Sequence, residues 1–506
     1  MWPRFSSLPS LRLPRPRLRE VLFFLLSACA TAPAWIVRHP PLQDLPTHLA
    51  ILRVVHSYSD PRYGFREDFQ LNLFHTQYLL YYLLGSLLAY VLGVVKANIA
   101  LMCLYLGGTV LAMRDLVRVL GKDERITIFT LPLLVNVMFL FGFLPFLLGI
   151  PTCLLGLSNA IRHIERPSRK TGIVLGVIAL ALFLLHLFPF ALFAIGFIAL
   201  FPWTRPREWI RAGLPVLPAA ALAVLWMASS ETGHNSLKSL STPGAGVLPY
   251  DASIQAAAQW SINVFRDPTD ELYFLLAGLV ALVAAGLAQG DRDRSRPVSR
   301  AYALLPIVCA VLYFTTGEYV GDVWLFAQRF PVLALITAVP LLRMPTGGRG
   351  LVVTVAAAAV GLGAILNVCQ HFVVFERTEV GDFDEALEQM APARRVAGLI
   401  FDKSSAVVNL APFLHFVSYY QAEKGGVIQF SNANIRYSPF HFKPDRFPPQ
   451  GQPARLRWEW TPEAARIEEL FPYYDYVLTR GPGFRPPAGT FHMKWHGDRW
   501  AVWEKG

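Results

Sequence analysis

The sequence predicts a polytopic α-helical membrane protein with about eleven transmembrane helices, a re-entrant or interfacial helix in the first outer loop, and a small C-terminal α/β soluble domain. Three observations lead to this fold class. The 506 residues are 54% hydrophobic and only 16% charged, whereas soluble proteins carry roughly 25% charged residues. Apolar runs long enough to cross a bilayer of roughly 30 Å recur along the chain. Residues 375–506 contain no such run and are polar, aromatic and rich in proline.

Twelve apolar segments precede residue 375, and each is a candidate membrane helix. They cover residues 20–37, 77–95, 97–113, 126–141, 145–161, 171–186, 188–203, 212–229, 271–289, 301–316, 330–343 and 351–373. The first follows five arginines and resembles a cleavable signal, but its apolar run continues to Val37, which favours a retained helix. All five cysteines lie in apolar segments, which argues against a disulfide framework in the C-terminal domain.

Clusters of Lys and Arg predict the topology. Six occur: the N-terminal tail and residues 114–125, 162–170, 205–211, 292–300 and 343–349. If segment 77–95 crossed the membrane, every cluster after the first would lie outside. If it does not cross, all six lie inside, as the positive-inside rule requires. We therefore expect a non-crossing helix at 77–95 within a long first outer loop, with the N-terminus inside and the C-terminal domain outside.

The chain divides into a membrane domain, residues 1–374, and an extracytoplasmic α/β domain, residues 375–506. β-like runs occur at Val396–Phe401 and Tyr473–Arg480, and a hairpin signature joins residues 491–495 to 500–504. Helices are expected at residues 379–390 and 411–421. Since the inner loops are short and basic, we expect function to lie on the outer face.

The stretch Pro40–His48 follows the first apolar segment directly. Asp44 and His48 are four residues apart, so a helix starting near Asp44 places both on one face. A carboxylate and an imidazole at the mouth of a membrane protein are candidates for acid/base chemistry or metal binding. The alternative is an N-cap, with Pro46 in the first turn, and a solvated histidine.

This layout resembles the GT-C superfamily of integral-membrane glycosyltransferases. Gln43–His48 is similar to the acidic first-loop motif of those enzymes, and Lys96–Gly121 resembles the span that follows it in bacterial members. The resemblance implies a donor sugar carried on polyprenyl phosphate and attacked at its anomeric carbon at the outer face. It also implies that Asp44 is the general base that deprotonates the acceptor hydroxyl.

The leaving phosphate requires cationic groups. Arg329, at the outer end of a span, is the first candidate because a guanidinium binds phosphate bidentately; its alternative role is an interfacial anchor. Arg266 and Lys238 are further candidates for substrate binding. His48 either supports Asp44 or faces solvent. His186, at an outer helix end, either lines the lipid groove or is an interfacial residue.

One departure from the superfamily concerns metal. Many members carry a second acidic residue in the next short outer loop, but Gly142–Phe146 contains none. We therefore expect no obligatory metal and no other cofactor. Substitute carboxylates that the sequence leaves open are Asp60, Glu67, Asp68, Glu318 and Asp322.

Several function classes lack support. Nucleotide-binding loops, zinc spacings and the nucleophile elbow are absent from the sequence. The net charge of +11 fits basic inner loops, so nucleic acid is not an expected partner. The expected function is a glycosyltransferase of the bacterial inner membrane, with membrane lipid, a polyprenyl-phosphate sugar donor and an unspecified acceptor as partners. The alternatives are a flippase or transporter of a lipid-linked substrate and a non-enzymatic scaffold whose outer aromatics, Tyr437–Phe447 and Trp458–Trp460, bind a partner.

Overall fold

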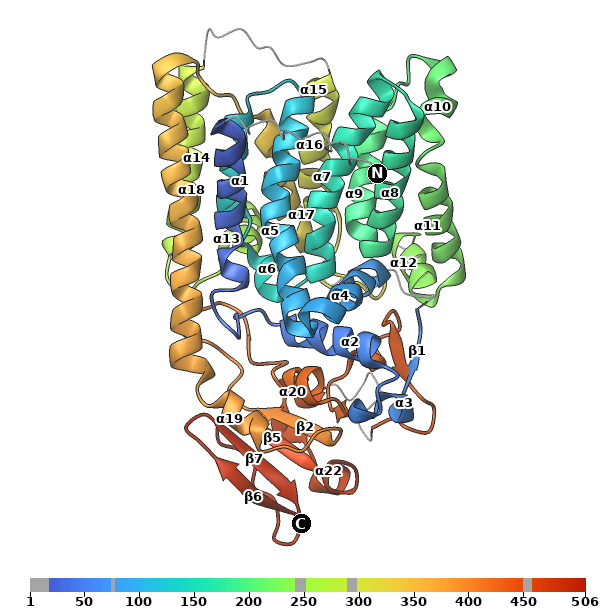
Figure 1. Ribbon diagram of the computed structural model, residues 1–506, viewed down its shortest axis with the longest axis vertical. Coiled ribbons are helices and arrows are strands. Elements are labelled where there is room, and N and C mark those ends of the chain that lie inside the picture. The colour runs from blue at the N-terminus through green and yellow to red at the C-terminus, as the bar shows by residue number, and fades with distance from the viewer. Residues whose placement is uncertain (1–17, 74–77, 242–251, 289–297, 449–456) are drawn as a thin grey trace, which may run out of the picture.

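Long apolar helices form one bundle in the computed structural model, which describes residues 18–73, 78–241, 252–288, 298–448 and 457–506 (Figure 1). The longest are α5 (Val94–Val119), α7 (Leu144–Glu165), α14 (Thr269–Leu287) and α18 (Gly347–Phe375). Within the described ranges, five helices are long and apolar enough to cross a membrane, or six if a bent pair at 206–229 forms one span. The chain is therefore a polytopic helical protein, whereas the count of eleven crossings remains a prediction.

Shorter helices complete the bundle. Most lie within predicted segments, but the helices at Glu231–Ser241 and Ile254–Ile262 lie between the predicted segments 212–229 and 271–289. The shorter helices are α1 (Leu18–Ala30), α8 (Arg169–Leu185), α9 (Leu187–Leu200), α10 (Trp209–Gly213), α11 (Leu217–Ser229), α12 (Glu231–Ser241), α13 (Ile254–Ile262), α15 (Val298–Tyr302), α16 (Leu304–Thr315) and α17 (Phe330–Ala338). The region 126–141 differs from the continuous helix expected. It is a 3₁₀ helix, Glu124–Leu133, followed by the short α6, Val137–Phe141. Pro132 lacks a backbone N–H, and the Asn136 side chain starts α6 by accepting the N–H of Phe139 at 3.1 Å.

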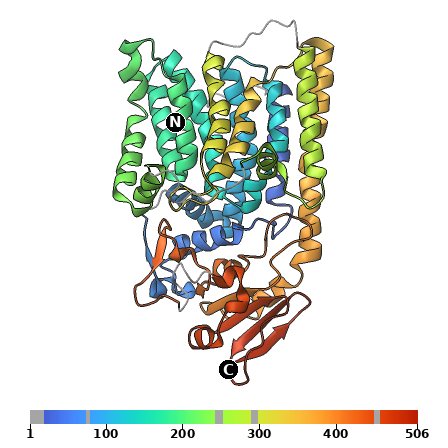
Figure 2. The same cartoon turned by 180° about the vertical axis from the view of Figure 1, so that it is seen from behind.

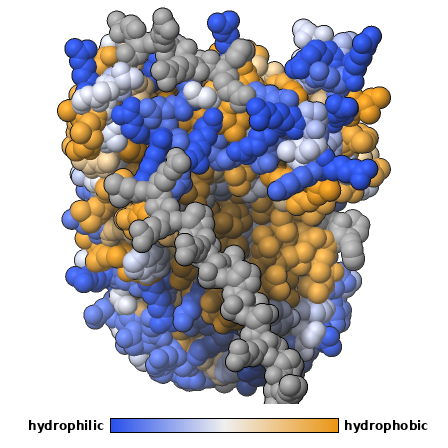
Figure 3. All heavy atoms as spheres, turned by 45° about the horizontal axis from the view of Figure 1, so that its top comes forward, coloured by the Kyte–Doolittle hydropathy of each residue, from blue (hydrophilic) through white to orange (hydrophobic). Residues whose placement is uncertain are grey.

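The outward faces of the bundle are suited to lipid. Only 6% of the 18-residue apolar stretch of α14 is buried inside the protein. Its side chains Leu275 and Leu282 are 66% and 72% exposed. Figure 3 shows hydrophilic residues gathered over one end of the bundle and a hydrophobic zone beyond them. Seen from behind, α14 and α18 stand together at one edge (Figure 2). Such large exposed apolar faces mark contact with a membrane.

Helix α4 (Leu79–Leu92) occupies most of the segment expected not to cross. Its 14 residues, at 1.5 Å per residue, reach about 21 Å, which is less than the roughly 30 Å of a bilayer core. It lies beside α2 (Leu45–Ser57) at the end of the bundle nearest the C-terminal region (Figure 1). Because helices that are expected to cross, such as α9 with 14 residues, are equally short, the expectation that this segment does not cross stays a prediction.

The C-terminal region contains a five-stranded sheet in the order β3-β2-β5-β7-β6. The strands are β2 (Arg395–Ile400), β3 (Val427–Ile428), β5 (Tyr476–Arg480), β6 (Phe491–His496) and β7 (Trp500–Lys505). β2 pairs in parallel with β3 and β5, whereas β7 is antiparallel to β5 and β6. The helices are α19 (Phe383–Glu388), α20 (Val417–Lys424), α21 (Arg457–Trp460) and α22 (Ile467–Tyr473). The strands at 396–401 and 473–480 and the terminal hairpin were expected close to these positions.

A second sheet joins the C-terminal region to the first outer loop. β1 (Phe69–Leu71), after α3 (Phe65–Asp68), pairs antiparallel with β4 (Phe440–Phe442). The Arg53 side chain of α2 donates to the Ala422 carbonyl of α20 at 2.6 Å. The ring of Phe69 packs on those of both Phe440 and Phe442. The C-terminal region is therefore docked on the first loop, which brings residues far apart in the sequence to one place.

Candidate functional site

A cavity of about 180 Å³ lies where α2, α4 and the C-terminal region meet the bundle. Its lining residues are Asp44, Thr47, His48, Ile51, Tyr78, Tyr82, Phe143, Pro145, Phe146, His186, Arg329, His415, Phe430, Asn432, Ile435, Tyr437, Ser438 and Pro439. Four of the six predicted site residues, Asp44, His48, His186 and Arg329, thus share one cavity. They come from three different segments: the start of α2, the N-cap of α9 and the turn before α17.

Two backbone hydrogen bonds hold the segment at Asp44 against the C-terminal end of α6. The N–H of Asp44 donates to the Phe141 carbonyl and the N–H of Gln43 donates to the Leu140 carbonyl, both at 3.0 Å. Gly142 has φ +79°, and a Cβ there would lie 3.0 Å from the Leu45 backbone nitrogen. The close approach therefore depends on glycine. Asp44 occupies the N-cap position of α2, but its side chain makes no capping hydrogen bond, which leaves the carboxylate available to the cavity.

The Asp44 carboxylate meets a buried histidine from the C-terminal region. Oδ1 of Asp44 lies 3.0 Å from Nδ1 of His415, and Nε2 of His415 contacts the Glu459 carboxylate. The ring of Phe430 stacks on His415 with centroids 4.5 Å apart. Burial opposes protonation, but Glu459 and Asp44 outweigh it and raise the pKa of His415. His415 is therefore a cation that pairs with two carboxylates.

His48 is held as a neutral group. Its Nδ1 lies 2.8 Å from the Tyr82 hydroxyl, and the Tyr82 ring stacks beside it. Burial in the cavity lowers the pKa of His48 to about 4, although Asp44 acts in the opposite direction. Since α2 places His48 one turn after Asp44, a neutral hydrogen-bonding imidazole lies next to the carboxylate.

Arg329 is buried among aromatic rings. Its guanidinium carbon lies 4.7 Å from the ring centroid of Phe143, 5.3 Å from that of Phe146 and 5.6 Å from that of Phe188. Nη2 donates to the Trp324 carbonyl at 3.2 Å. Within the described part of the chain, Nε has no hydrogen-bond partner and no carboxylate lies within ion-pair distance of the guanidinium. A buried cation without an anionic partner is a site for an anionic ligand.

His186 favours an anion at the same position. Its Nδ1 accepts the backbone N–H of Phe188 at 3.0 Å, where it caps α9. The proton of the neutral ring is then on Nε2, which lies 3.3 Å from Nη1 of Arg329. Two N–H groups thus face each other across this contact. An oxyanion that bridges both nitrogens from the cavity would accept from both.

The other two predicted substrate-binding residues lie elsewhere. Lys238 is on the exposed helix α12 and is not among the lining residues. The Arg266 side chain donates to the Ser405 carbonyl at 3.2 Å and lines a separate cavity beside Asp267 and His371. Arg266 thus contributes to docking of the C-terminal region.

The carboxylates of the described residues do not form a metal cluster: no group of three or more His, Cys, Asp or Glu side chains there is arranged to hold an ion. Asp44 and Glu459 bind opposite nitrogens of His415, so they do not converge on one point. The substitute carboxylates Asp60, Glu67, Asp68, Glu318 and Asp322 are also not lining residues of the cavity.

Sequence reasoning missed His415 and Glu459. His415 follows Ala411–Leu414 in a stretch expected to be helical, but α20 starts only at Val417, and the residues before it form a turn. A lone histidine in the run Phe413-Leu414-His415-Phe416 indicates a buried, partnered imidazole. The sequence offers no signal that its partner is Asp44.

Among known proteins, solved structures are the ones that match this chain. No protein-family model matches the chain, and a search of curated proteins finds no match. Comparison with solved structures finds proteins that share the fold of this chain. The matching structures are of ArnT from Cupriavidus metallidurans. The apo state shares 13% identity with a TM-score of 0.56, and the state bound to undecaprenyl phosphate shares 12% with a TM-score of 0.54. Both matches cover 96% of this chain and 97% of ArnT, and at this identity they establish the fold.

The positive charge on His415 should make the stability of the fold depend on pH. Because its pKa is raised above the unfolded value of about 6.5, its ion pairs stabilise the fold fully below that pH. The contribution is lost as pH rises toward the raised pKa. We expect His415→Gln to lower the melting temperature most near pH 6 and progressively less at alkaline pH, as measured by thermal unfolding of the purified protein.

His163→Gln is the matched control. His163 is equally buried, but its ring nitrogens contact the Thr171 hydroxyl and the Arg211 carbonyl. Comparison with His163→Gln shows how much of any pH dependence comes from the loss of a buried histidine as such. A His415→Gln deficit that does not change with pH would contradict a cationic His415.

Proposed function

We propose that the protein is a membrane glycosyltransferase that transfers a sugar from a polyprenyl-phosphate donor to an acceptor at the outer face of the bacterial inner membrane. The observation that carries the proposal is one cavity lined by an ionisable carboxylate, Asp44, and by a buried guanidinium without a carboxylate partner among the described residues, Arg329. Glycosyl transfer needs these two groups, one at the nucleophile and one at the leaving phosphate.

In this proposal Asp44 accepts the proton of the acceptor hydroxyl as its oxygen attacks the anomeric carbon. The new bond to the acceptor oxygen forms as the bond between the anomeric carbon and the phosphate oxygen breaks. Polyprenyl phosphate leaves with the bonding electrons, and Arg329 together with Nε2–H of His186 binds its oxyanion. His415 holds the Asp44 carboxylate in position from the opposite side of the cavity.

The donor class has separate support. The similar protein ArnT has been solved bound to undecaprenyl phosphate, and its fold spans almost the whole of this chain. The aromatic rings around Arg329 give the phosphate site an apolar wall, which suits the first prenyl units of a lipid carrier. The lipid-facing helices of the bundle keep this site at the membrane, where such a donor resides.

The test uses the purified protein in lipid vesicles with a panel of polyprenyl-phosphate sugars and bacterial envelope extracts as the acceptor source. We expect acceptor-dependent release of polyprenyl phosphate from one donor of the panel. The free carrier, polyprenyl phosphate, should also bind. Absence of both carrier binding and release across the panel would refute the proposal.

We further propose that the C-terminal region and the cavity lie outside the cytoplasm, since this arrangement places all six basic clusters inside. In a cysteine-free background, we expect a membrane-impermeant thiol reagent to label Ser404→Cys on intact cells. It should not label Gly348→Cys, which lies at the opposite end of the bundle. A side chain added there has no neighbouring atom within 4 Å, so the fold does not block labelling. Labelling of residue 348 with protection of residue 404 would reverse the topology.

A further inference from the structure

A cavity of about 1230 Å³, much larger than the one at Asp44, opens at the end of the bundle farthest from the C-terminal region. Its walls come from α1, the turn after α5 with the 3₁₀ helix that follows, and α18. Pockets for drug-sized ligands measure about 300–1,000 Å³. The size therefore suits an occupant larger than a free ion or a metabolite.

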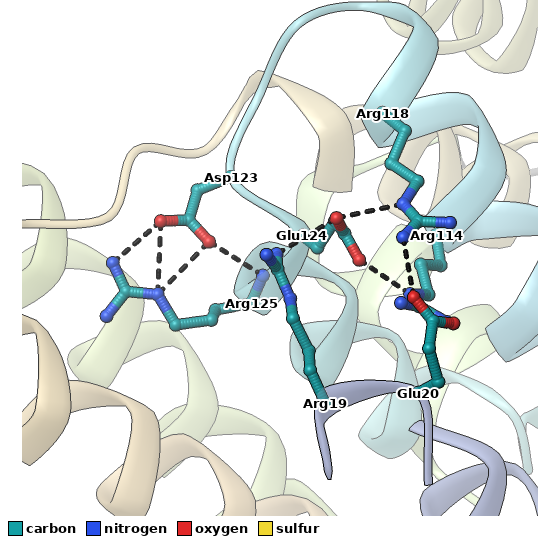
Figure 4. Close-up of polar contacts among 7 residues, drawn as sticks. All are labelled: Arg19, Glu20, Arg114, Arg118, Asp123, Glu124 and Arg125. Carbon is teal, nitrogen blue, oxygen red and sulfur yellow. Dashed lines mark hydrogen bonds and ion pairs between the residues drawn. The ribbon is translucent and has the colours of Figure 1, made fainter. Parts of the chain in front are cut away.

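The rim of this cavity carries an excess of positive charge. Four cationic side chains line it, Arg19, Lys122, Arg125 and Arg343, against two carboxylates, Asp123 and Glu124. Both carboxylates are already engaged (Figure 4). Asp123 binds Arg125 with a closest distance of 2.6 Å, and Glu124 is 3.0 Å from Arg19. Counted over the lining residues, the rim carries two more cationic than anionic side chains, which attracts an anion.

The ion pairs also make this rim rigid. Glu124 accepts from Arg114 at 2.7 Å and contacts Arg118 at 2.8 Å, and Glu20 of α1 bridges the same two arginines (Figure 4). Arg114 and Glu124 are nearly inaccessible to solvent, so breaking their pair is costly. The start of α1 is therefore fixed to the turn after α5, with Arg19 held at the rim.

Below the rim the walls are apolar. Leu22, Leu25 and Leu26 project from one face of α1, and Ala358 and Leu362 face them from α18. Leu22 and Leu25 are more than half exposed. Basic pockets between membrane helices bind the headgroups of acidic lipids while the acyl chains lie against the helices. A free phosphate would leave this apolar wall unused.

We propose that this cavity binds an acidic phospholipid. The phosphodiester lies among the cationic side chains at the rim, where guanidinium groups donate to its oxygens. The acyl chains run down the groove between α1 and α18. The lipid thereby fills the gap between these helices and is a separate ligand from the donor at the Asp44 cavity.

The test is native mass spectrometry of the full-length protein in detergent, titrated with phosphatidylglycerol, phosphatidylcholine or inorganic phosphate. We expect phosphatidylglycerol to bind about tenfold more tightly than phosphatidylcholine, because phosphatidylcholine carries the same phosphodiester but adds a quaternary ammonium, which the cationic rim repels. Arg343→Gln should weaken phosphatidylglycerol about tenfold. Ala358→Trp should do the same by filling the groove while keeping every charge.

Arg207→Gln is the control: it removes one positive charge from an exposed arginine in a basic loop that does not line the cavity. It should bind phosphatidylglycerol as the wild type does. Equal binding of both lipids, equal losses in Arg343→Gln and Arg207→Gln, or unchanged binding in Ala358→Trp would each overturn the proposal. Displacement of the lipid by millimolar inorganic phosphate would assign the site to a phosphate ion instead. Melting temperatures report whether each variant is folded.

Discussion

Asp44→Asn is expected to lower the rate of sugar transfer by about 10²–10⁴-fold, the usual contribution of a general base. The amide is nearly isosteric with the carboxylate, and the backbone hydrogen bond that fixes residue 44 to Phe141 does not involve the side chain. The protein should therefore fold, and it should still bind the donor, because Arg329 is unchanged. The measurement is the rate of polyprenyl phosphate release at saturating donor.

Asp60→Asn provides the matched control. Asp60 lies in the same first loop and pairs with Arg62 at 2.6 Å, but it is not a lining residue of the cavity. It should keep wild-type turnover. Wild-type turnover in Asp44→Asn would remove Asp44 as the base, and loss of donor binding in that variant would indicate a structural role instead.

Arg329→Lys is expected to weaken binding of polyprenyl phosphate by about 10–100-fold, although the charge is kept. A single charge-assisted hydrogen bond contributes about 1.5–3 kcal/mol, and an ammonium lacks the planar fork that binds two phosphate oxygens at once. The substitution also removes the packing of the planar guanidinium on Phe143, whose ring centroid lies 4.7 Å from the guanidinium carbon of Arg329. Carrier binding measured by tryptophan quenching or calorimetry tests this directly.

The control is Arg62→Lys, the partner of Asp60, whose exposed guanidinium lies outside the cavity. It should bind the carrier as the wild type does. Normal carrier binding by Arg329→Ala would dismiss the phosphate assignment while leaving the role of Asp44 to its own test. The two experiments therefore separate the leaving-group site from the base.

Much of the fold could be predicted because burial and membrane crossing leave strong patterns in a sequence. The long apolar helices α7 and α14 and the strands β2 and β5 lie close to their expected positions. The break at 134–136 was missed, because hydropathy does not register a proline within a 3₁₀ helix or an asparagine cap.

Topology and residue type were enough to select the four candidate residues that line one cavity. A carboxylate just after the first span and an arginine at the outer end of another identify Asp44 and Arg329. The same reasoning also selected Lys238 and Arg266, because sequence position does not say which outer loops converge. His415 and Glu459 reach Asp44 through the docking of β1 on β4, a contact between strands about 370 residues apart that leaves no local pattern.

The pairing of β1 with β4 has a consequence for biosynthesis. Ribosomes add about 5–20 residues per second, so Asp44 emerges roughly 20–80 seconds before Glu459. During that interval the first loop lacks its strand partner, and the Asp44 carboxylate has neither His415 nor the segment 430–439 that closes its cavity. The cavity is therefore completed only by segments that are translated late. A product terminated before residue 415 would contain the helices of the bundle yet lack this part of the cavity wall, so formation of the cavity depends on translation of the C-terminal region.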